Sequence, residues 1–288
     1  MIVAGVDAGA RAIKVVLLDP RSGAVVGRAI ATQGTDPAAR ASALLTGALA
    51  ERGLSRQELA ALVATGYARG AMREASSTVT EITCHARGVR QLAPETRTVV
   101  EIGAQDSKVI WLDERGGVRD FAMNDRCAAG SGRFLEVLAA RLQTDIAELG
   151  ALAAGGRAPA TINSTCAVFA DNEVTGLLAT GASPADIAAG VVRSLASRVG
   201  AMVGARAVPP VALTGGVALI PGISEALAEA IGVPVSIPPD PQFTGALGAA
   251  LIATDEWAAG RGLGQARDCG RGPRGRPALA RVEGSRHA

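Results

Sequence analysis

The sequence predicts an α/β protein made of two duplicated domains, and three observations lead to this prediction. A segment that begins at Asp7 returns with the same pattern 94 positions later, at Glu101. In each copy, short runs of β-branched residues flank a turn that contains glycine. Segments with helical apolar periodicity follow each copy. Because strands and then helices occur twice along one chain, we expect two α/β domains.

The repeat aligns residue types as well as hydropathy. The segment DAGARAIKVVLLD starts at Asp7, and EIGAQDSKVIWLD starts at Glu101. The chain contains 27 arginines and only two lysines, Lys14 and Lys108, and both lysines stand at the equivalent position of the repeat. Chance is a poor explanation of this coincidence. The two copies are therefore predicted to fold alike.

Each copy is expected to open with a three-stranded meander and to continue with helices. The predicted strands cover residues 2–6, 13–18, 24–31 and 59–64 in the first copy, and 98–102, 108–112, 117–122 and 211–213 in the second. Asp36 can cap a helix that runs to about residue 51, with Pro37 in its first turn, and Ser55 can open another helix with Glu58 completing a capping box. Further helices are predicted over residues 78–92, 130–142, 166–178, 184–206, 222–231 and 245–253. The first domain is expected to span residues 1–95, completed by a C-terminal helix at 244–256, and the second to span residues 96–243.

Two of the predicted turns combine a carboxylate with a glycine at the end of a strand. The backbone N–H groups of such a turn can approach phosphate oxygens closely, and the carboxylate can hold Mg²⁺ through its waters. If the two turns face each other, they can clamp the phosphates of a nucleotide. The residues concerned are Asp7, Gly9 and Ala10 in the first turn, and Glu101, Gly103 and Ala104 in the second.

A third turn, rich in glycine, follows the predicted strand at 211–213. It contains Thr214, Gly215 and Gly216, and its bare backbone can pass beside an adenosine. An ordinary hairpin or helix entry is the alternative for each turn taken singly. Taken together and in this order, the three turns predict nucleotide binding. A P-loop fold is not expected, because the sequence lacks GxxxxGK[ST].

Two cysteines stand where loops are expected to enter helices. Cys127 lies in NDRCAAGSGR, and Cys166 lies in NSTCAVF. A helix N-terminus lowers the pKa of a thiol and favours anions, which suits a ligand of an anionic cluster. Simple packing of two small side chains is the alternative, since CxxC is absent and Fe–S clusters are typically held by four thiolates. A symmetric dimer that contributes both cysteines from each protomer would supply four.

Longer motifs make the chain resemble the ATP-dependent activators of 2-hydroxyacyl-CoA dehydratases, which are related to the ATPase subunits of benzoyl-CoA reductases. The resemblance covers residues 2–254. It rests on ATGYAR from Ala64, EITCHARG from Glu81, IGAQDSK from Ile102, MNDRCAAGSGRFLE from Met123, STCAVFADNEV from Ser164, TGGVA from Thr214 and GALGAAL from Gly245. The cysteine-bearing motifs are more specific than the phosphate turns. The resemblance implies the actin/Hsp70/hexokinase-like ATPase fold.

The resemblance also implies cofactors and residue roles. It implies a homodimer with one [4Fe–4S] cluster at the subunit interface, bound by Cys127 and Cys166 of both chains. The roles implied in the nucleotide site are Asp7 and Glu101 for Mg²⁺, the Gly9-Ala10 and Gly103-Ala104 turns with Lys14 and Lys108 for phosphates, Gln105 or Asp106 for the attacking water, and Thr214, Gly215 and Gly216 for adenosine. Cys84 and His85 are expected to be structural, and Cys269 falls in the C-terminal tail.

The activity implied by the resemblance is electron transfer gated by ATP. A ferredoxin or flavodoxin would reduce the cluster, and ATP would change the angle between the helices that carry the cysteines. One electron would then pass to a partner Fe–S enzyme acting on an acyl-CoA. Two alternatives remain open, an ATPase subunit of a benzoyl-CoA reductase and, from a different class, a sugar or acyl-group kinase of the same fold.

Two departures from the family pattern concern the phosphate turns. A small hydroxyl residue usually follows the first glycine, and here Ala10 and Arg11 stand instead, which removes a phosphate donor. The second turn usually begins with Asp, and here it begins with Glu101. One extra methylene moves the carboxylate by about 1.5 Å, which disturbs Mg²⁺ geometry unless the backbone compensates.

Composition limits the remaining classes. Hydrophobic residues make up 48% and charged residues 19% of 288, and apolar stretches are broken before membrane-spanning length, so no transmembrane helix is expected. The N-terminus lacks the pattern of a signal peptide, and a cytoplasmic location is expected. Aromatic residues are only 2%, which disfavours single-stranded nucleic acid. Residues 261–288 hold seven arginines against two acids and are predicted to form a disordered tail, dispensable for folding and ATP binding.

Overall fold

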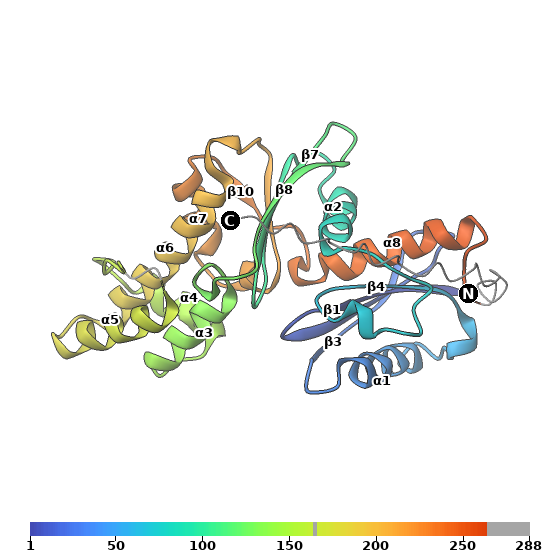
Figure 1. The fold of residues 1–288 in the computed structure, drawn as a ribbon, viewed down its shortest axis with the longest axis horizontal. Helices are drawn as coiled ribbons and strands as arrows, with labels where there is room; N and C mark the ends of the chain where they lie inside the picture. The colour runs from blue at the N-terminus through green and yellow to red at the C-terminus, as the bar shows by residue number, and fades with distance from the viewer. Residues whose placement is uncertain (164–165, 264–288) are drawn as a thin grey trace, which may run out of the picture.

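The computed structural model describes residues 1–163 and 166–263, which form two lobes joined near the centre of the molecule (Figure 1). Each lobe is built around one five-stranded sheet. The predicted tail beyond residue 263, with Cys269, lies outside the described residues. The α/β prediction is confirmed by these two sheets and the helices that cover them.

The two sheets have the same topology. In the first, the strand order is β3-β2-β1-β4-β5, and in the second it is β10-β9-β6-β7-β8. Each consists of an antiparallel meander with two further strands added in parallel beside its first strand. The strands are β1 (Ile2–Ala8), β2 (Ala12–Leu18), β3 (Val25–Thr32), β4 (Leu59–Thr65), β5 (Ser77–Thr78), β6 (Thr98–Ile102), β7 (Ser107–Leu112), β8 (Val118–Asn124), β9 (Val211–Thr214) and β10 (Val235–Ser236).

Strand register shows that the duplication extends beyond the sequence repeat. Asp7 pairs with Lys14 across β1 and β2, and Glu101 pairs with Lys108 across β6 and β7. On the other side of the same strands, Asp7 pairs with Thr65, and Glu101 pairs with Thr214. A Thr-Gly pair therefore stands at the end of the strand that runs parallel to β1 or β6: Thr65-Gly66 at the end of β4 and Thr214-Gly215 at the end of β9. These two segments were not recognised as equivalent in the sequence.

Helices cover both faces of the sheets. The α-helices are α1 (Pro37–Ala50), α2 (Glu81–Leu92), α3 (Gly132–Arg141), α4 (Ile146–Ala154), α5 (Ala167–Ala179), α6 (Pro184–Val203), α7 (Ile223–Ile231) and α8 (Thr244–Ala258). Short 3-10 turns are η1 (Arg56–Glu58), η2 (Arg69–Ala71), η3 (Ala128–Gly130), η4 (Gly204–Arg206), η5 (Gly216–Leu219) and η6 (Pro241–Phe243). Neither α4 nor the two-residue strand β10 was predicted from the sequence.

Helix starts in the first lobe follow the predicted caps only in part. Asp36 caps α1 by accepting a hydrogen bond from the backbone N–H of Ala39, as predicted. The capping box of Ser55 and Glu58 also forms, but the helix that it opens is a single 3-10 turn, because β4 begins at the next residue. The predicted helix at 78–92 begins only at residue 81, since residues 77–78 pair with β4 and Thr80 caps α2.

The predicted helix at 130–142 also starts later than expected. Its helical hydrogen bonding begins at Gly132, after η3. The start of α3 is hydrogen-bonded to the second phosphate turn. The N–H of Gly132 donates to the carbonyl oxygen of Gly103, and the N–H of Arg133 donates to that of Ala104, both at 2.8 Å. Cys127 therefore caps the short turn η3 rather than an α-helix, whereas Cys166 is the N-cap residue of α5 as expected.

Four apolar clusters hold the lobes together. One face of the first sheet packs on α1 and the other on α8. The second sheet packs on α2 with one face and on α3, α6 and α7 with the other. Within the described residues, α6 and its extension through η4 are long and apolar enough to cross a membrane, but its apolar residues lie in this second core. Core packing accounts for its composition.

Helices α2 and α8 cross between the lobes, where both appear at the centre of Figure 1. The crossing is close because glycines face backbone atoms. A Cβ added at Gly88 would collide with the carbonyl oxygen of Thr244, and one added at Gly248 would collide with that of Cys84. Cys84 is fully buried here, which confirms its expected packing role. The α2/α8 contact fixes the lobes around the space between them.

Candidate functional site

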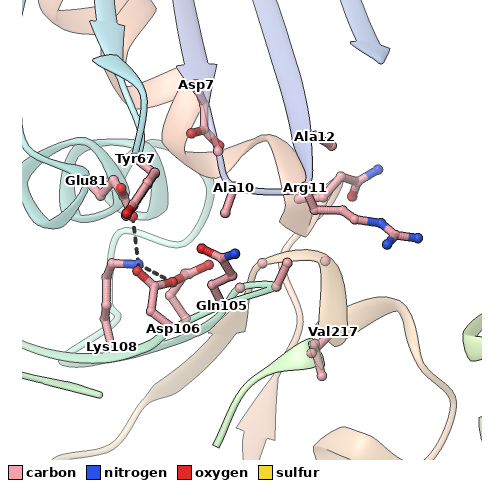
Figure 2. Close-up of a pocket in the computed structure, with 18 of the residues that line it drawn as sticks. Asp7, Ala10, Arg11, Ala12, Tyr67, Glu81, Gln105, Asp106, Lys108 and Val217 are labelled. Atoms are coloured by element: carbon pink, nitrogen blue, oxygen red, sulfur yellow. Dashed lines mark hydrogen bonds and ion pairs between the residues drawn. The ribbon is translucent and has the colours of Figure 1, made fainter. Parts of the chain in front are cut away.

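A cavity of about 860 Å³ lies between the lobes, where the three glycine-containing turns converge (Figure 2). Both lobes contribute to its walls. The predicted residues that line it are Asp7, Gly9, Ala10, Lys14, Glu101, Gly103, Ala104, Gln105, Asp106, Lys108, Gly215 and Gly216. Its volume falls in the range of small-molecule and cofactor pockets.

The first turn places a paired charge at the end of β1. Asp7 is almost fully buried, and its Oδ2 accepts a hydrogen bond from Nζ of Lys14 at 3.1 Å. Oδ1 faces Gly66, where an added Cβ would approach this oxygen to 2.6 Å. Gly66 has φ +94°, a conformation that favours glycine. Arg69 donates to the carbonyl oxygen of Gly66 at 3.1 Å and fixes this corner.

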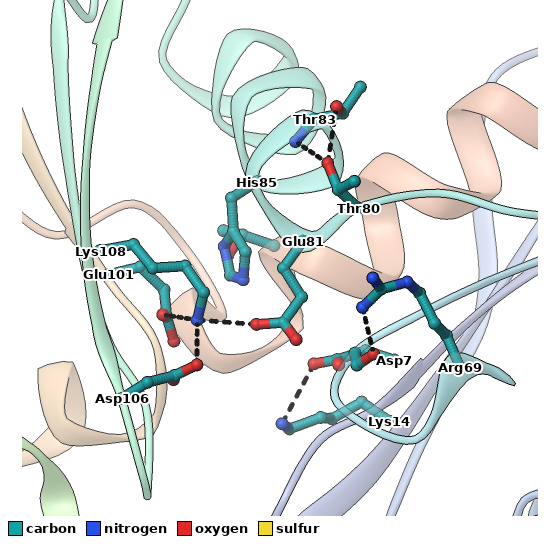
Figure 3. Close-up of polar contacts among 12 residues, drawn as sticks. Asp7, Lys14, Arg69, Thr80, Glu81, Thr83, His85, Glu101, Asp106 and Lys108 are labelled. Atoms are coloured by element: carbon teal, nitrogen blue, oxygen red, sulfur yellow. Dashed lines mark hydrogen bonds and ion pairs between the residues drawn. The ribbon is translucent and has the colours of Figure 1, made fainter. Parts of the chain in front are cut away.

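The second turn buries its lysine under three carboxylates (Figure 3). Nζ of Lys108 lies 2.7 Å from Glu81, 2.9 Å from Glu101 and 2.9 Å from Asp106. The Lys108 side chain is only 2% exposed. Glu81 comes from the first turn of α2, so the cluster joins this helix to the second sheet. The ammonium of Lys108 is engaged by these groups, and its predicted contact with phosphate stays a prediction.

Burial and charge act in opposite directions on the pKa values of this cluster. Burial alone would lower the pKa of Lys108, but the charges of Glu101, Glu81 and Asp106 together outweigh it and raise that pKa. Burial raises the pKa of Glu101 and of Glu81, and the charge of Lys108 opposes both shifts. Burial also disfavours the Lys14 ammonium, but the charge and hydrogen bond of Asp7, together with the charges of Glu101 and Glu81, outweigh burial and raise the pKa of Lys14.

The charges around the two turns do not balance. Four carboxylates face two ammonium groups and one guanidinium, which leaves an excess of one negative charge at the cavity floor: Asp7, Glu81, Glu101 and Asp106 against Lys14, Lys108 and Arg69. Carboxylate oxygens are the preferred ligands of Mg²⁺. The buried Oε1 of Gln242, which lines the same cavity, has no hydrogen-bond partner in the described structure. These groups fit a hydrated divalent cation.

The longer side chain of Glu101 is accommodated because two residues next to it are glycines. An added Cβ at Gly215 would lie 2.8 Å from Oε1 of Glu101, and one at Gly103 would lie 3.2 Å from it. Gly215 has φ +90° and ends β9 as Gly66 ends β4. The two glycines give the longer carboxylate room to reach Lys108 and still line the cavity.

The third turn borders an apolar end of the cavity. Gly216 opens η5, and behind it Val217, Leu219 and Ile220 line the cavity together with Ile146 at the start of α4. An open backbone beside apolar side chains suits a flat heterocycle. Thr214 itself does not line the cavity, because its side chain is fully buried beneath the turn.

The two predicted cluster cysteines lie outside the cavity and are exposed. Cys127 is held by its loop, since its N–H donates to Oδ1 of Asn124 at 3.1 Å and its carbonyl accepts from Nδ2 at 2.9 Å. Val168 and Phe169, two and three residues after Cys166, are 68% and 65% exposed. Among the described residues, no three His, Cys, Asp or Glu side chains are placed so that they could bind a metal ion directly. Two exposed thiols fit a cluster only if a second chain completes the set.

His85 is a structural residue, as expected. It is buried, and its Nδ1 lies 2.9 Å from Oγ1 of Thr244 at the α2/α8 crossing. Burial, together with the charge of Lys108, lowers the pKa of His85 to about 4. A neutral imidazole at this position ties the floor of the cavity to the helix crossing. Burial likewise raises the pKa of the neighbouring Cys84 to about 12.

Comparison with known proteins decides the family. A model of the BadF/BadG/BcrA/BcrD ATPase family matches residues 4–253. The chain belongs to this ATPase family. Its similarity to the 2-hydroxyisocaproyl-CoA dehydratase activator of Clostridioides difficile is 42% identity over 258 residues, 89% of this chain and 96% of the relative. The (R)-2-hydroxyglutaryl-CoA dehydratase activating ATPase of Acidaminococcus fermentans is 39% identical, over 86% of this chain and 95% of the relative.

Solved structures agree with this family assignment. The 2-hydroxyisocaproyl-CoA dehydratase activator from Clostridium difficile with bound ADPNP superposes with a TM-score of 0.86 at 40% identity, covering 91% of this chain and 97% of that one. One component of the benzoyl-CoA reductase of Thauera aromatica is a more distant relative, at 34% identity over 87% of this chain and 92% of the relative. A glucokinase of the ROK family from Streptomyces griseus, at 14% identity and a TM-score of 0.55 over 88% of this chain and 100% of that one, shares the fold alone, which is the actin/Hsp70/hexokinase-like fold.

For this member of the ATPase family, Glu81 is a site residue that was not predicted from the sequence. It supplies the shortest contact of Lys108, at 2.7 Å, from the opposite side of the cavity floor. A signal was present, since a Thr80 cap followed directly by an acid marks the first turn of a helix. The predicted start of that helix, three residues too early, concealed it. Arg11 was interpreted only as the loss of a hydroxyl, although its side chain lines the cavity.

Proposed function

We propose that the chain binds Mg²⁺-ATP in the cavity and hydrolyses it to drive electron transfer to a 2-hydroxyacyl-CoA dehydratase. The observation that carries the nucleotide part is the pair of duplicated turns on opposite walls of one cavity, each with a carboxylate, a lysine and a glycine-lined backbone. Both turns can reach the same polyphosphate, whereas a single turn would be an ordinary hairpin.

The chemistry of each group supports a role in this proposal. Asp7 and Glu101 would hold a hydrated Mg²⁺, which would supply charge neutralisation to the phosphates, and Lys14 would face the phosphates from the first turn. Gln105 extends from the second turn toward the first in Figure 2, whereas Asp106 is held by Lys108. We therefore assign Gln105 to orienting the attacking water and Asp106 to positioning Lys108. The apolar end beside Gly216 takes the adenine.

The cysteines support a shared iron–sulfur centre in a homodimer. One [4Fe–4S] cluster, held by Cys127 and Cys166 of two chains, would supply one-electron transfer. The exposed Val168 and Phe169 beside Cys166 are apolar surface that a second copy would cover. Arg198 donates to the carbonyl oxygen of Ala129 at 3.4 Å, so a positive charge lies beside the loop that carries Cys127 and suits an anionic group there.

A backbone connection supports coupling between the nucleotide and this centre. The second turn and the start of α3 share two hydrogen bonds, from Gly132 to Gly103 and from Arg133 to Ala104. The loop of Cys127 leads directly into this start. Helices α3 and α5 are tied by a bidentate pair between Arg141 and Asp171, with contacts at 2.7 and 2.5 Å. A displacement of the second turn is thus passed to both segments that carry the cysteines.

The partners and location follow from this activity. We propose a reduced ferredoxin or flavodoxin as the one-electron donor, an Fe–S dehydratase as the acceptor, and the cytoplasm as the compartment. A benzoyl-CoA reductase complex is the second candidate, because one of its components is similar to this chain over most of its length. A kinase needs no thiol pair and is disfavoured by the exposed cysteines.

The test measures nucleotide and iron separately. Calorimetry should detect Mg²⁺-ATP binding by the intact dimer, and the Asp7→Asn variant should weaken it. Iron analysis and EPR after anaerobic purification should give about four irons per dimer. Cys127→Ser or Cys166→Ser should abolish the cluster, whereas the buried Cys84→Ser should retain it. Four irons per monomer would contradict the shared centre, and absence of nucleotide binding would contradict the ATPase.

A further inference from the structure

An ion pair spans the cavity between the two lobes. Nη1 of Arg11, in the first phosphate turn, lies 2.8 Å from Oε1 of Glu136 on α3. Both residues line the cavity. Arg11 projects from the first turn at the edge of the cavity in Figure 2. The pair thus connects the first lobe to the helix that follows the Cys127 loop.

Arg11 differs from the other cations that line the cavity in how firmly it is held. Lys108 is buried under three carboxylates, Lys14 is held by Asp7, and Arg69 donates to the carbonyl of Gly66. The Arg11 side chain is 58% exposed. An exposed ion pair contributes little free energy, so its partner is readily exchanged.

We propose that Arg11 is a polyphosphate-binding residue that exchanges Glu136 for the phosphates when the nucleotide enters. A phosphate group carries more charge than a carboxylate and matches the guanidinium with two parallel hydrogen bonds. Arg11 therefore replaces the hydroxyl donor that the first turn lacks. The inference rests on the proposed nucleotide binding and adds Arg11 to the residues that bind the phosphates.

Glu136 is not left without a partner by the exchange. Its Oε2 accepts a hydrogen bond from Arg133 at 3.0 Å, one turn earlier on α3. After the exchange, α3 keeps its two backbone bonds to the second turn and loses its side-chain link to the first. Nucleotide binding then releases α3 from the first lobe only. The segment that follows Cys127 therefore has two states: one in which Glu136 links α3 to Arg11 of the first lobe, and one in which this link is broken.

The exchange predicts effects of opposite sign for the two partners. Arg11→Ala should weaken ADP binding about tenfold, because a charge-assisted contact with phosphate is lost. Glu136→Gln should strengthen ADP binding about threefold, because Arg11 no longer has to leave a carboxylate. In the Arg11→Ala background, Glu136→Gln should have no further effect on ADP. Adenosine, which has no phosphate, should show neither change.

The experiment is a double-mutant cycle by calorimetry on the full-length protein with Mg²⁺, using ADP and adenosine as probes. Arg193→Ala and Glu229→Gln are matched controls, since this exposed pair, 2.9 Å apart, lies outside the cavity. The proposal is overturned if Arg11→Ala leaves ADP affinity unchanged, or if Glu136→Gln acts equally in both backgrounds. If the wild-type protein binds neither probe, the proposed function itself fails, and this outcome is distinct from the first two.

Discussion

The two lysines of the repeat make a matched pair for testing how burial decides the importance of a charge. Both pair across a hairpin with the acid that ends the first strand. Lys108 has three carboxylates within 2.9 Å and a side chain 2% exposed. Lys14 has one, Asp7, at 3.1 Å, and its side chain is 17% exposed. Substitution by methionine removes the charge of each and keeps a similar volume.

The expected loss follows from what each substitution leaves behind. Lys108→Met leaves three carboxylates, one buried and two partly buried, without a counter-charge, which should lower the free energy of unfolding by about 3 to 5 kcal/mol near neutral pH. Lys14→Met leaves one carboxylate beside an open cavity that water enters, and the expected loss is about 1 to 2 kcal/mol. The difference between the two variants is the quantity of interest.

Urea denaturation at about pH 7.5 and about pH 5 measures both losses and their pH dependence. Without Lys108, the pKa values of Glu81 and Glu101, already raised by burial, rise further. The folded variant then binds protons more readily than its unfolded state, so its stability increases as the pH falls. The deficit of Lys108→Met should therefore shrink at the lower pH. Equal losses for the two lysine variants, or a deficit independent of pH, would refute this reasoning.

Three further predictions concern His85 at the floor of the cavity, the α2/α8 crossing and the third turn. The pKa of His85 is about 4 when folded against an ordinary value of 6.5, so its contribution to stability is present above about pH 6.5 and is lost as the pH falls toward 4, by about 3 kcal/mol. His85→Asn should flatten this part of a stability-versus-pH profile, and an unchanged slope would contradict the assignment. Gly248→Ala should cost at least about 2 kcal/mol in thermal unfolding, because its Cβ meets the carbonyl of Cys84. Gly47→Ala, in open space on α1, should be neutral or stabilising, and similar losses for both would argue against the close crossing. Gly215→Ala, at φ +90°, should weaken ADP binding in calorimetry by about tenfold in the folded variant, and unchanged affinity would remove the third turn from the site.

Sequence alone determined the elements whose signals are local. The repeat around Asp7 and Glu101 predicted two like domains, because it is written in residue types at fixed spacing. Apolar, β-branched runs around a glycine-containing turn predicted the meanders, and the Asp36 cap predicted the start of α1. The start of α5 beside Cys166 was predicted in the same way. Each of these signals lies within a few residues along the chain.

Only the tertiary structure decided the relations between distant segments. Glu81 reaches Lys108 because α2 crosses between the lobes, and the pair of Arg11 with Glu136 exists because the two turns face each other. The equivalence of Gly66 and Gly215 was recognised only from strand register, since the Thr-Gly pair that the two segments share is too short a signal by itself. These contacts depend on how sheets and helices pack over the whole chain, and no local pattern encodes that packing.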